Sequence, residues 1–276
     1  MTVFAALQLC STADVAQNNA TIEALVRDAA RQGAQVVSLP EAANILLKDQ
    51  MAYPRLCLPE AEDTTLALCV SLAAELGIWL HTGSLLVRTE DGTRVWNRAH
   101  VISPEGRIIA CYDKLHTFDV ALGGAGDFIE SRAVSPGEKG AVICDAAGHT
   151  LGLSICYDLR FAYLFRALAT AGANVLMIPA SFSPITGPLH WEVLLKARAI
   201  ETGAYVVAAA QCGMRDGVAT FGQSRIISPM GEVLASAGDV PCVILADIVA
   251  ETVASTRRRL PVLSQTREIG KVTYAS

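Results

Sequence analysis

Three side chains with complementary chemistry follow three separate strand-like segments of the sequence. Glu41 comes after a short apolar strand and a proline, Lys114 directly follows another strand, and Cys156 stands where the apolar run Leu151 to Ile155 stops. Because α/β proteins gather the carboxyl ends of their strands at one edge, we expect this carboxylate, ammonium and thiol to meet there. Together these groups suit the cleavage of an amide by a thiol nucleophile.

Each of the three residues also has a simpler structural explanation. Taken alone, Glu41 is explained by a solvated turn, and Lys114 by a surface lysine that pairs with Asp113 or Glu105. A lone Cys156 is more often a buried cysteine that packs as a small hydrophobe. The functional interpretation therefore depends on all three residues occurring together.

The expected reaction passes through a thioester. Glu41 takes the proton of the Cys156 thiol, later gives a proton to departing ammonia, and then activates the water that releases the acyl group. Lys114 and the backbone N–H of Tyr157 neutralise the oxygen charge of the tetrahedral intermediate. A helix start after Cys156 favours the thiolate. A cysteine nevertheless has a pKa of about 8.5, so a base is required near neutral pH.

The chain resembles the carbon–nitrogen hydrolases of the nitrilase superfamily along nearly its whole length. The resemblance is carried by the motifs Leu39-Pro40-Glu41, Tyr112-Asp113-Lys114-Leu115-His116 and Ile155-Cys156-Tyr157-Asp158-Leu159-Arg160-Phe161. Their order and spacing suit the Glu–Lys–Cys triad of that family. The resemblance implies an α/β fold, a four-layer αββα sandwich with mixed sheets, and no cofactor. It also implies a homodimer or homotetramer in which helices near the nucleophile pack between subunits.

Members of this family carry a second glutamate in the loop between the lysine and the cysteine. Glu130, within the segment Phe128 to Arg132, matches that position best, and its implied role is to orient Lys114 and the attacking groups. Asp127 and Glu138 are alternative counterparts. An exposed loop acid is the structural alternative for Glu130.

Further segments resemble the branch of amidases that cut the ω-amide of deaminated glutathione. These segments are Ser181 to Glu192, Ala197 to Thr202, Tyr205 to Gly213, Gly222 to Arg225 and Leu260 to Leu263. The resemblance implies hydrolysis of a keto-acid amide with release of ammonia. An ω-amidase that acts on 2-oxoglutaramate or similar small keto-acid amides is the alternative, because the acyl half of both substrates is the same.

Two alternatives come from other functional classes. A catalytically idle family member would act as a binding partner, although the presence of all three reactive residues argues against it. A serine hydrolase is disfavoured, because Gly152-Leu153-Ser154-Ile155-Cys156 lacks the second glycine of G-x-S-x-G. Strand alternation also directs Ser154 into the core. No segment favours hydrolysis of nitriles or carbamoyl groups.

The substrate implied by the resemblance carries carboxylates beside its amide. Arg160, four residues after Cys156, is able to hold a carboxylate through two hydrogen bonds, with an ion pair inside the fold as its alternative role. The residues expected to bind the substrate are Tyr157, Arg160, Ser181, Phe182, Thr186 and, from the long loop 115–137, Arg132.

Strand-like and helix-like segments alternate along the sequence, which predicts one α/β domain over residues 1–276. Helical periodicity predicts helices at 18–31, 64–76, 163–171 and 190–202. Apolar runs predict strands at 3–9, 36–39, 78–87, 141–145, 151–155, 174–178 and 205–210. Turn residues predict hairpins at Asp91-Gly92, Pro104-Glu105-Gly106 and Pro229-Met230-Gly231, the last between strands 225–228 and 232–235.

Composition excludes several classes of protein. Of the 276 residues, 52% are hydrophobic and 18% are charged, which argues against disorder. A net charge of −5 argues against a nucleic-acid-binding surface or a basic membrane patch. No segment reaches the roughly 18 apolar residues that a membrane span needs. We therefore expect neither nucleic acid nor membrane as a partner.

The cysteines and histidines favour a reduced protein without a metal. None of the eight cysteines forms a C-x-x-C pair, which predicts free thiols in a cytosol-like compartment. The five histidines show no H-x-x-x-H spacing, so no metal site is expected. The first ten residues have no basic segment typical of a signal peptide, which agrees with a cytoplasmic location.

Overall fold

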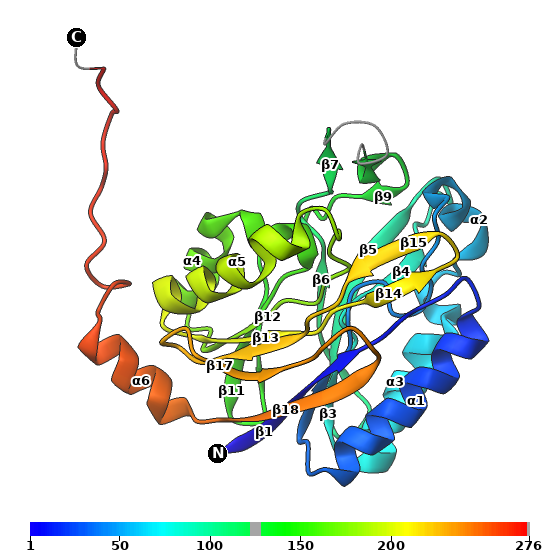
Figure 1. Ribbon diagram of the computed structural model, residues 1–276, viewed down its shortest axis with the longest axis horizontal. Helices are drawn as coiled ribbons and strands as arrows, with labels where there is room; N and C mark the ends of the chain where they lie inside the picture. The colour runs from blue at the N-terminus through cyan, green and yellow to red at the C-terminus, as the bar shows by residue number, and fades with distance from the viewer. Residues whose placement is uncertain (122–127, 275–276) are drawn as a thin grey trace.

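The computed structural model describes residues 1–121 and 128–274 (Figure 1). Its larger sheet has the order β18-β1-β2-β3-β5-β4, and β6 and β9 also pair with β5. These strands are β1 (Thr2–Gln8), β2 (Val36–Ser38), β3 (Trp79–His81), β4 (Leu85–Arg88), β5 (Val95–Ile102), β6 (Ile108–Asp113), β9 (Val134–Ser135) and β18 (Cys242–Ile248). Strands β1, β2 and β3 run parallel to one another, whereas β18 and β4 pair antiparallel at the two sides.

The second sheet has the order β10-β11-β12-β13-β16-β17. These strands are β10 (Ile143–Ala146), β11 (His149–Leu153), β12 (Val175–Met177), β13 (Tyr205–Ala208), β16 (Arg225–Ile227) and β17 (Val233–Ser236). Two short ribbons lie outside the sheets: β7 (Asp119–Val120) with β8 (Phe128–Ile129), and β14 (Cys212–Arg215) with β15 (Val218–Phe221). Both large sheets mix parallel and antiparallel pairs, as predicted.

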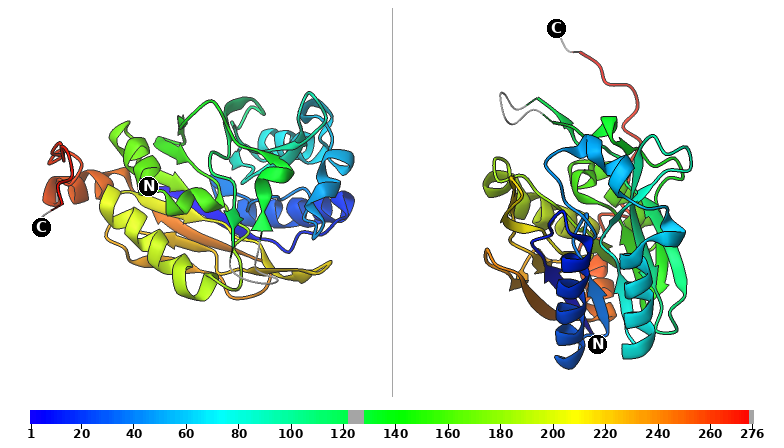
Figure 2. Two further views of the ribbon diagram at one scale, coloured as in Figure 1. Left: turned by 90° about the horizontal axis from the view of Figure 1, so that it is seen from above. Right: turned by 90° about the vertical axis from the view of Figure 1, so that its right-hand side faces the viewer.

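Helices cover the outer face of each sheet, and the two sheets face each other between them (Figures 1 and 2). The helices are α1 (Val15–Arg31), α2 (Tyr53–Leu56), α3 (Thr64–Leu76), α4 (Ala162–Thr170), α5 (Gly187–Thr202) and α6 (Ala250–Arg259). Short 3₁₀ turns are η1 (Gln50–Ala52), η2 (Glu60–Glu62), η4 (Glu130–Arg132) and η5 (Cys156–Arg160). Helices α1 and α3 lie on one side and α4 and α5 on the other, so the predicted four-layer αββα sandwich is confirmed.

Burial on both faces explains why the strands are continuous apolar runs. In β1, Phe4 and Ala6 join the core between the sheets, whereas Ala5 and Leu7 pack beneath α1 and α3. Strict alternation of polar and apolar residues is absent from such strands, because neither face meets water. The fold therefore depends on side chains that pack in both directions from the same strand.

The helices begin and end at residues suited to those positions. Asp14 and Asp63 accept hydrogen bonds from the first backbone N–H groups of α1 and α3. Gly77 and Gly203 end α3 and α5 in the left-handed conformation. Helix α5 begins three residues before the predicted helix 190–202, because a proline in its first turn needs no hydrogen-bond partner for its nitrogen.

The predicted strand 78–87 is wrong in one respect. The structure breaks it into β3 and β4 at a turn around Gly83, whose φ is +64°. Apolar content alone could not reveal this break. The β14–β15 ribbon and strand β18 were not predicted either. Glycine and polar residues interrupt the pattern of the ribbon, whereas the apolar run 243–246 in β18 was an available signal.

The described residues, 1–121 and 128–274, include no helix with both the length and the apolar character required to cross a bilayer.

We predict that Gly83→Ala damages the loop that carries Glu41. An added Cβ would lie 2.1 Å from the Leu39 carbonyl oxygen and 2.2 Å from the Pro40 carbonyl oxygen, and backbone atoms cannot yield easily. We expect a loss of about 2–5 kcal/mol in the free energy of unfolding by urea, from overpacking and strained φ.

Gly77→Ala is the matched control for this prediction. Gly77 has the same φ of +64°, but its added Cβ meets nothing within 4 Å. It should lose only about 1 kcal/mol, the cost of the left-handed conformation. Equal losses in the two variants would contradict the role assigned to the contact with the Glu41 loop.

Candidate active site

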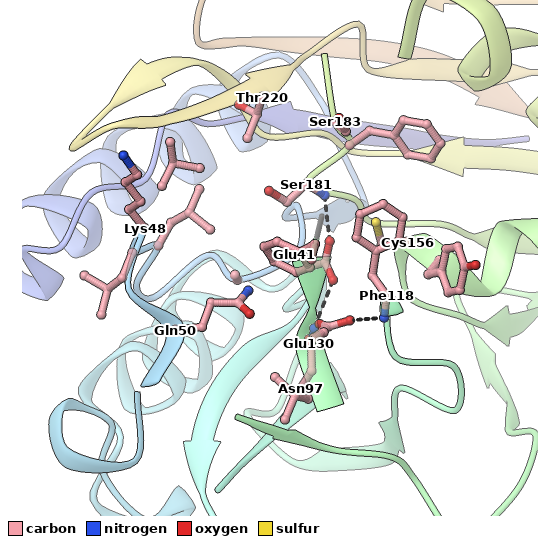
Figure 3. A pocket seen from close by; sticks show the side chains of 18 of the residues that line it. Glu41, Lys48, Gln50, Asn97, Phe118, Glu130, Cys156, Ser181, Ser183 and Thr220 are labelled. Carbon is pink, nitrogen blue, oxygen red and sulfur yellow. Dashed lines mark hydrogen bonds between the residues drawn. The ribbon is translucent and has the colours of Figure 1, made fainter. Parts of the chain in front are cut away.

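The ends of three strands and one 3₁₀ turn bring four reactive side chains together. Glu41 follows β2, Lys114 follows β6, Cys156 follows β11, and Glu130 begins η4. All four side chains are buried, with exposed fractions between 2% and 7%. Figure 3 shows Glu41, Glu130 and Cys156 directed toward one another. The sequence-based expectation that these groups meet at one edge agrees with this arrangement.

The Lys114 ammonium is the centre of the cluster. Its Nζ lies 2.7 Å from Glu41 Oε1 and 2.9 Å from each oxygen of Glu130. Burial alone would lower the pKa of Lys114, but the two carboxylates more than offset burial and raise the pKa well above its ordinary value. Lys114 is therefore charged, and its ammonium forms ion pairs with both Glu41 and Glu130.

Glu41 is held by donors on both of its oxygens. Asn97 Nδ2 donates to Oε1 at 2.9 Å, and the backbone N–H of Ser181 donates to Oε2 at 2.7 Å. Burial acts to raise the pKa of Glu41, but the charge and hydrogen bond of Lys114 bring the pKa below its ordinary value. Glu41 therefore stays an ionised carboxylate although it is buried, as a general base requires.

Glu130 occupies a different electrostatic position from Glu41. Burial raises the pKa of Glu130; Lys114 opposes the rise, while the negative charge of Glu41 adds to it. The backbone N–H of Phe118 also donates to Glu130. Of the alternative loop acids, Glu138 is exposed and does not line the pocket, and Asp127 lies outside the described residues.

Cys156 occupies a strained backbone position that presents its side chain to Glu41. Its φ is +47°, and its own N–H donates to the Pro179 carbonyl at 2.8 Å. Burial, followed by the negative charge of Glu41, raises the pKa of the Cys156 thiol well above its ordinary value. The expected stabilisation of a thiolate by a helix start is not found, since only the five-residue turn η5 begins here. The resting group is a thiol beside a base.

Asp158 fixes the shape of the nucleophile turn, a role that the sequence analysis missed. This fully buried carboxylate accepts from the Ile155 N–H at 2.9 Å and from the Tyr112 hydroxyl at 2.6 Å. It also accepts from the His116 N–H at 3.1 Å. It thereby joins the turn of Cys156 to the chain on either side of Lys114. An acid two residues after the nucleophile, where turn N–H groups need acceptors, was the available signal.

A pocket of about 470 Å³ opens onto the four reactive side chains. Its walls come from the segment after β2, from η4, from η5, from the segment before α5 and from the β14–β15 ribbon. The residues that line it are Glu41, Ala42, Leu46, Leu47, Lys48, Gln50, Tyr53, Leu86, Asn97, Lys114, Phe118, Phe128, Glu130, Val134, Cys156, Tyr157, Arg160, Ser181, Phe182, Ser183, Pro184, Ile185, Thr186, Gly217, Val218, Ala219 and Thr220.

Most residues expected to bind substrate line this pocket. The structure places Tyr157, Arg160, Ser181, Phe182 and Thr186 in its wall. Arg132 is exposed and is not in the wall. Residues two positions apart on a 3₁₀ turn point in different directions. Because Glu130 points inward from η4, Arg132 at its other end points outward.

The alternative role of Arg160, an ion pair inside the fold, is not found: no carboxylate among the described residues pairs with its guanidinium. Its Nη1 lies 3.1 Å from His190 Nδ1, and its guanidinium lies over the rings of Tyr157 and Phe182 at 5.8 and 5.5 Å. The Thr186 hydroxyl is buried in the same wall and has no hydrogen-bond partner among the described residues. This end of the pocket thus offers a cation and an unsatisfied hydroxyl.

Two other groups bear on the alternatives raised by the sequence. Ser154 is fully buried and its hydroxyl donates to the Met177 carbonyl at 2.8 Å, so it serves the core rather than the pocket. Glu60, His100 and Cys111 have ligand atoms within 4.8 Å of one another, away from the pocket lining. The Glu60 carboxylate already binds the Arg98 guanidinium, so this group is explained as part of an ion-pair cluster.

Comparisons with known proteins agree with this architecture. Residues 4–258 match the family model described as carbon-nitrogen hydrolase. A deaminated glutathione amidase from Homo sapiens is 40% identical over 267 residues, which cover 95% of this chain and 81% of that protein. A human omega-amidase is 36% identical over 245 residues, covering 88% of this chain and 86% of that protein.

A solved structure is similar over almost the whole fold. The Caenorhabditis elegans NitFhit protein has a TM-score of 0.90 and 32% identity. The match covers 96% of this chain, which spans 65% of the length of that protein. The layers, the convergent strand ends and these matches lead to one conclusion: the chain belongs to the carbon–nitrogen hydrolase family.

Proposed function

We propose that this chain is an amidase that hydrolyses the ω-amide of a keto acid, with deaminated glutathione as its preferred substrate. The observation that carries the proposal is the meeting of a buried carboxylate, a buried ammonium and a buried thiol in one pocket. The named activities of the two human relatives support the substrate class.

Glu41 acts first as the base. It takes the Cys156 proton as sulfur attacks the amide carbon, and the carbonyl oxygen receives the electron pair. Lys114 and the Tyr157 N–H stabilise this oxygen, since the N–H of Cys156 itself is bound to Pro179. Glu41 then protonates the departing nitrogen, the carbon–nitrogen bond breaks and a thioester remains. Water, deprotonated by Glu41, attacks the thioester and returns sulfur to the thiol.

Glu130 and Asp158 are positioning residues in this scheme. Glu130 accepts hydrogen bonds from the Lys114 ammonium through both of its oxygens. Asp158 holds the backbone turn of Cys156 and the segment after Lys114 in one register. Both therefore act through another residue rather than on the substrate.

Deaminated glutathione requires one correction to the chemistry expected from the sequence. Its ω-amide nitrogen belongs to a cysteinylglycine unit, so the product of this cleavage is a dipeptide amine rather than ammonia. Ammonia leaves only from an unsubstituted amide such as 2-oxoglutaramate, the small-substrate alternative. The two substrates form the same thioester and differ only in the group that Glu41 protonates.

The acyl half is assigned to the Arg160 end of the pocket. Its terminal carboxylate would bind the Arg160 guanidinium, which no described acid neutralises. The buried Thr186 hydroxyl, which no described residue hydrogen-bonds, would donate to the keto or carboxylate oxygens. Phe182 would supply the apolar wall beside the methylene groups.

The first prediction tests the reaction itself. Wild-type protein should hydrolyse deaminated glutathione to cysteinylglycine and 2-oxoglutarate with a higher kcat/KM than it shows for 2-oxoglutaramate. Cys156→Ala should lower turnover of both at least about 10³-fold, because no thioester can form. Product release is measured by mass spectrometry, with circular dichroism to confirm an intact fold. A wild-type protein that cleaves neither amide would favour an idle, binding role, and an active Cys156→Ala would exclude the nucleophile.

A second prediction separates the base from the nucleophile. The negative charge of Glu41 raises the pKa of the Cys156 thiol, so the neutral variant Glu41→Gln should lower that pKa. The midpoint of Cys156 alkylation by iodoacetamide against pH should therefore move to lower pH, while amide turnover is lost. Peptide mass spectrometry follows alkylation. Glu192→Gln, on the exposed side of α5, is the control and should leave the midpoint in place. An unchanged or higher midpoint in Glu41→Gln would count against the assigned pair.

We also propose that the protein is a homo-oligomer joined through α4 and α5. Leu189, Val193 and Ile200 are 71%, 65% and 51% exposed along one face of α5, and Tyr163 of α4 is 65% exposed. An apolar helical stripe of this kind favours burial against another subunit. A cytoplasmic location is proposed as well, because all eight cysteines are free thiols.

The third prediction concerns this face. The double variant Leu189→Glu/Val193→Glu should shift the mass in light scattering from an oligomer to a smaller species, because two charges cannot be buried there without partners. Val240→Glu, at a residue 66% exposed elsewhere, is the control and should keep the wild-type mass. A monomeric wild type, or an unchanged mass in the double variant, would exclude this interface.

A further inference from the structure

The charges that line the pocket do not cancel locally. Glu41 and Glu130 both form ion pairs with Lys114, whose Nζ lies 2.7 Å from Glu41 Oε1 and 2.9 Å from Glu130 Oε1. Two further cations, Lys48 and Arg160, line the same pocket. Neither makes an ion pair with any residue that the structure describes. The cluster of Lys114 with two carboxylates carries a net charge of −1, so these two cations bring the lining to a net charge of +1. Each of the two cations outside the cluster can receive one anionic group of a ligand.

Lys48 lies on a different wall from Arg160. It belongs to the segment between β2 and η1, and its aliphatic stem packs over the turn of the β14–β15 ribbon, where an added Gly217 Cβ would lie 3.2 Å from Lys48 Cδ. In the view of Figure 3, Lys48 and Cys156 lie on opposite sides of Glu41. Lys48 is exposed, so its ammonium remains free to turn into the pocket mouth.

Arg160 belongs to the nucleophile side. It ends η5, the turn that begins with Cys156, and its guanidinium lies over Tyr157 and Phe182. Glu41 stands on the other side of the reacting centre and receives Ser181 N–H on its far oxygen. The nitrogen that leaves must lie next to the acid that protonates it. The leaving half of the substrate therefore extends past Glu41, in the direction of Lys48.

We propose that Lys48 forms a carboxylate subsite for the leaving half of the substrate. The substrate class is then an amide with a carboxylate at each end, one on the acyl side at Arg160 and one on the amine side at Lys48. This inference rests on the proposed amidase function and narrows it. It favours an amide substituted by a short acidic peptide over an unsubstituted amide, which has no group to reach Lys48.

The subsite has a kinetic signature that a structural role would not give. Lys48 contacts only the leaving half, which is gone once the thioester has formed. It therefore affects kcat/KM for acylation, whereas the hydrolysis of the thioester, common to all substrates with this acyl half, is independent of it. Substrates without the distal carboxylate do not sense Lys48 at all.

The test compares Lys48→Met with the wild type on three substrates. The first is deaminated glutathione. The second is the same molecule with the carboxylate of its leaving cysteinylglycine half converted to a carboxamide. The third is 2-oxoglutaramate. For Lys48→Met we expect kcat/KM on deaminated glutathione to fall about 3- to 10-fold, as for a partly exposed ion pair to a ligand. The other two substrates should keep their wild-type kcat/KM. Lys48→Arg should restore most of the preference, and Lys139→Met, at an exposed lysine outside the pocket lining, should behave as the wild type.

The outcomes distinguish this inference from the proposed function. If the wild type cleaves none of the three amides, the amidase proposal itself fails. If the wild type cleaves them but Lys48→Met lowers kcat/KM equally for all three, Lys48 supports the pocket and the subsite is excluded. If Lys48→Met leaves the preference for the carboxylate over the carboxamide unchanged, another group binds that carboxylate. A loss confined to deaminated glutathione, which diminishes as salt is raised, supports the subsite.

Discussion

The ammonium of Lys114, buried between two carboxylates, is the interaction on which this site depends. An isolated charge at that depth would be strongly unfavourable, and removal of one partner from such a group typically costs about 3–5 kcal/mol. Glu41, Lys114 and Glu130 are far apart in sequence, so each stabilises the others only in the folded chain. The same contacts that make the charges tolerable also keep Glu41 ionised beside a neutral thiol.

The rest of the structure aligns the chain around this cluster. Asp158 joins the turn of Cys156 to the segment after Lys114, and Gly83 permits a turn to lie directly against the loop of Glu41. Both devices act on backbone rather than on substrate. Asp158 ties the end of β11 to the end of β6, and Gly83 lets the β3–β4 turn support the end of β2, so both position the reactive residues without contributing to the reaction directly.

The sequence predicted the parts of the site that follow from topology. Glu41, Lys114 and Cys156 could be grouped because each follows a strand, and strand ends converge for reasons independent of detailed packing. Arg132 could not be placed, since its direction depends on how η4 turns after Glu130. The protonation of Cys156 was also beyond reach, because it depends on burial and on the distance to Glu41. Asp158 was visible as a residue, but Tyr112 and His116, which donate to it, lie more than 40 positions earlier in the chain and only the fold brings them near.

The pocket is built from two kinds of wall. The reactive groups and Arg160 stand at strand ends and on η5, within layers that pack on both faces, whereas Lys48 stands on a connecting segment against the β14–β15 ribbon, which belongs to neither large sheet. Replacements at the turn of that ribbon, around Gly217, would change the wall beside Lys48 without altering the residues that hydrogen-bond to Glu41 and Lys114. Evolution is therefore free to change the preference for the leaving amine through this turn while the residues that cleave the bond stay the same.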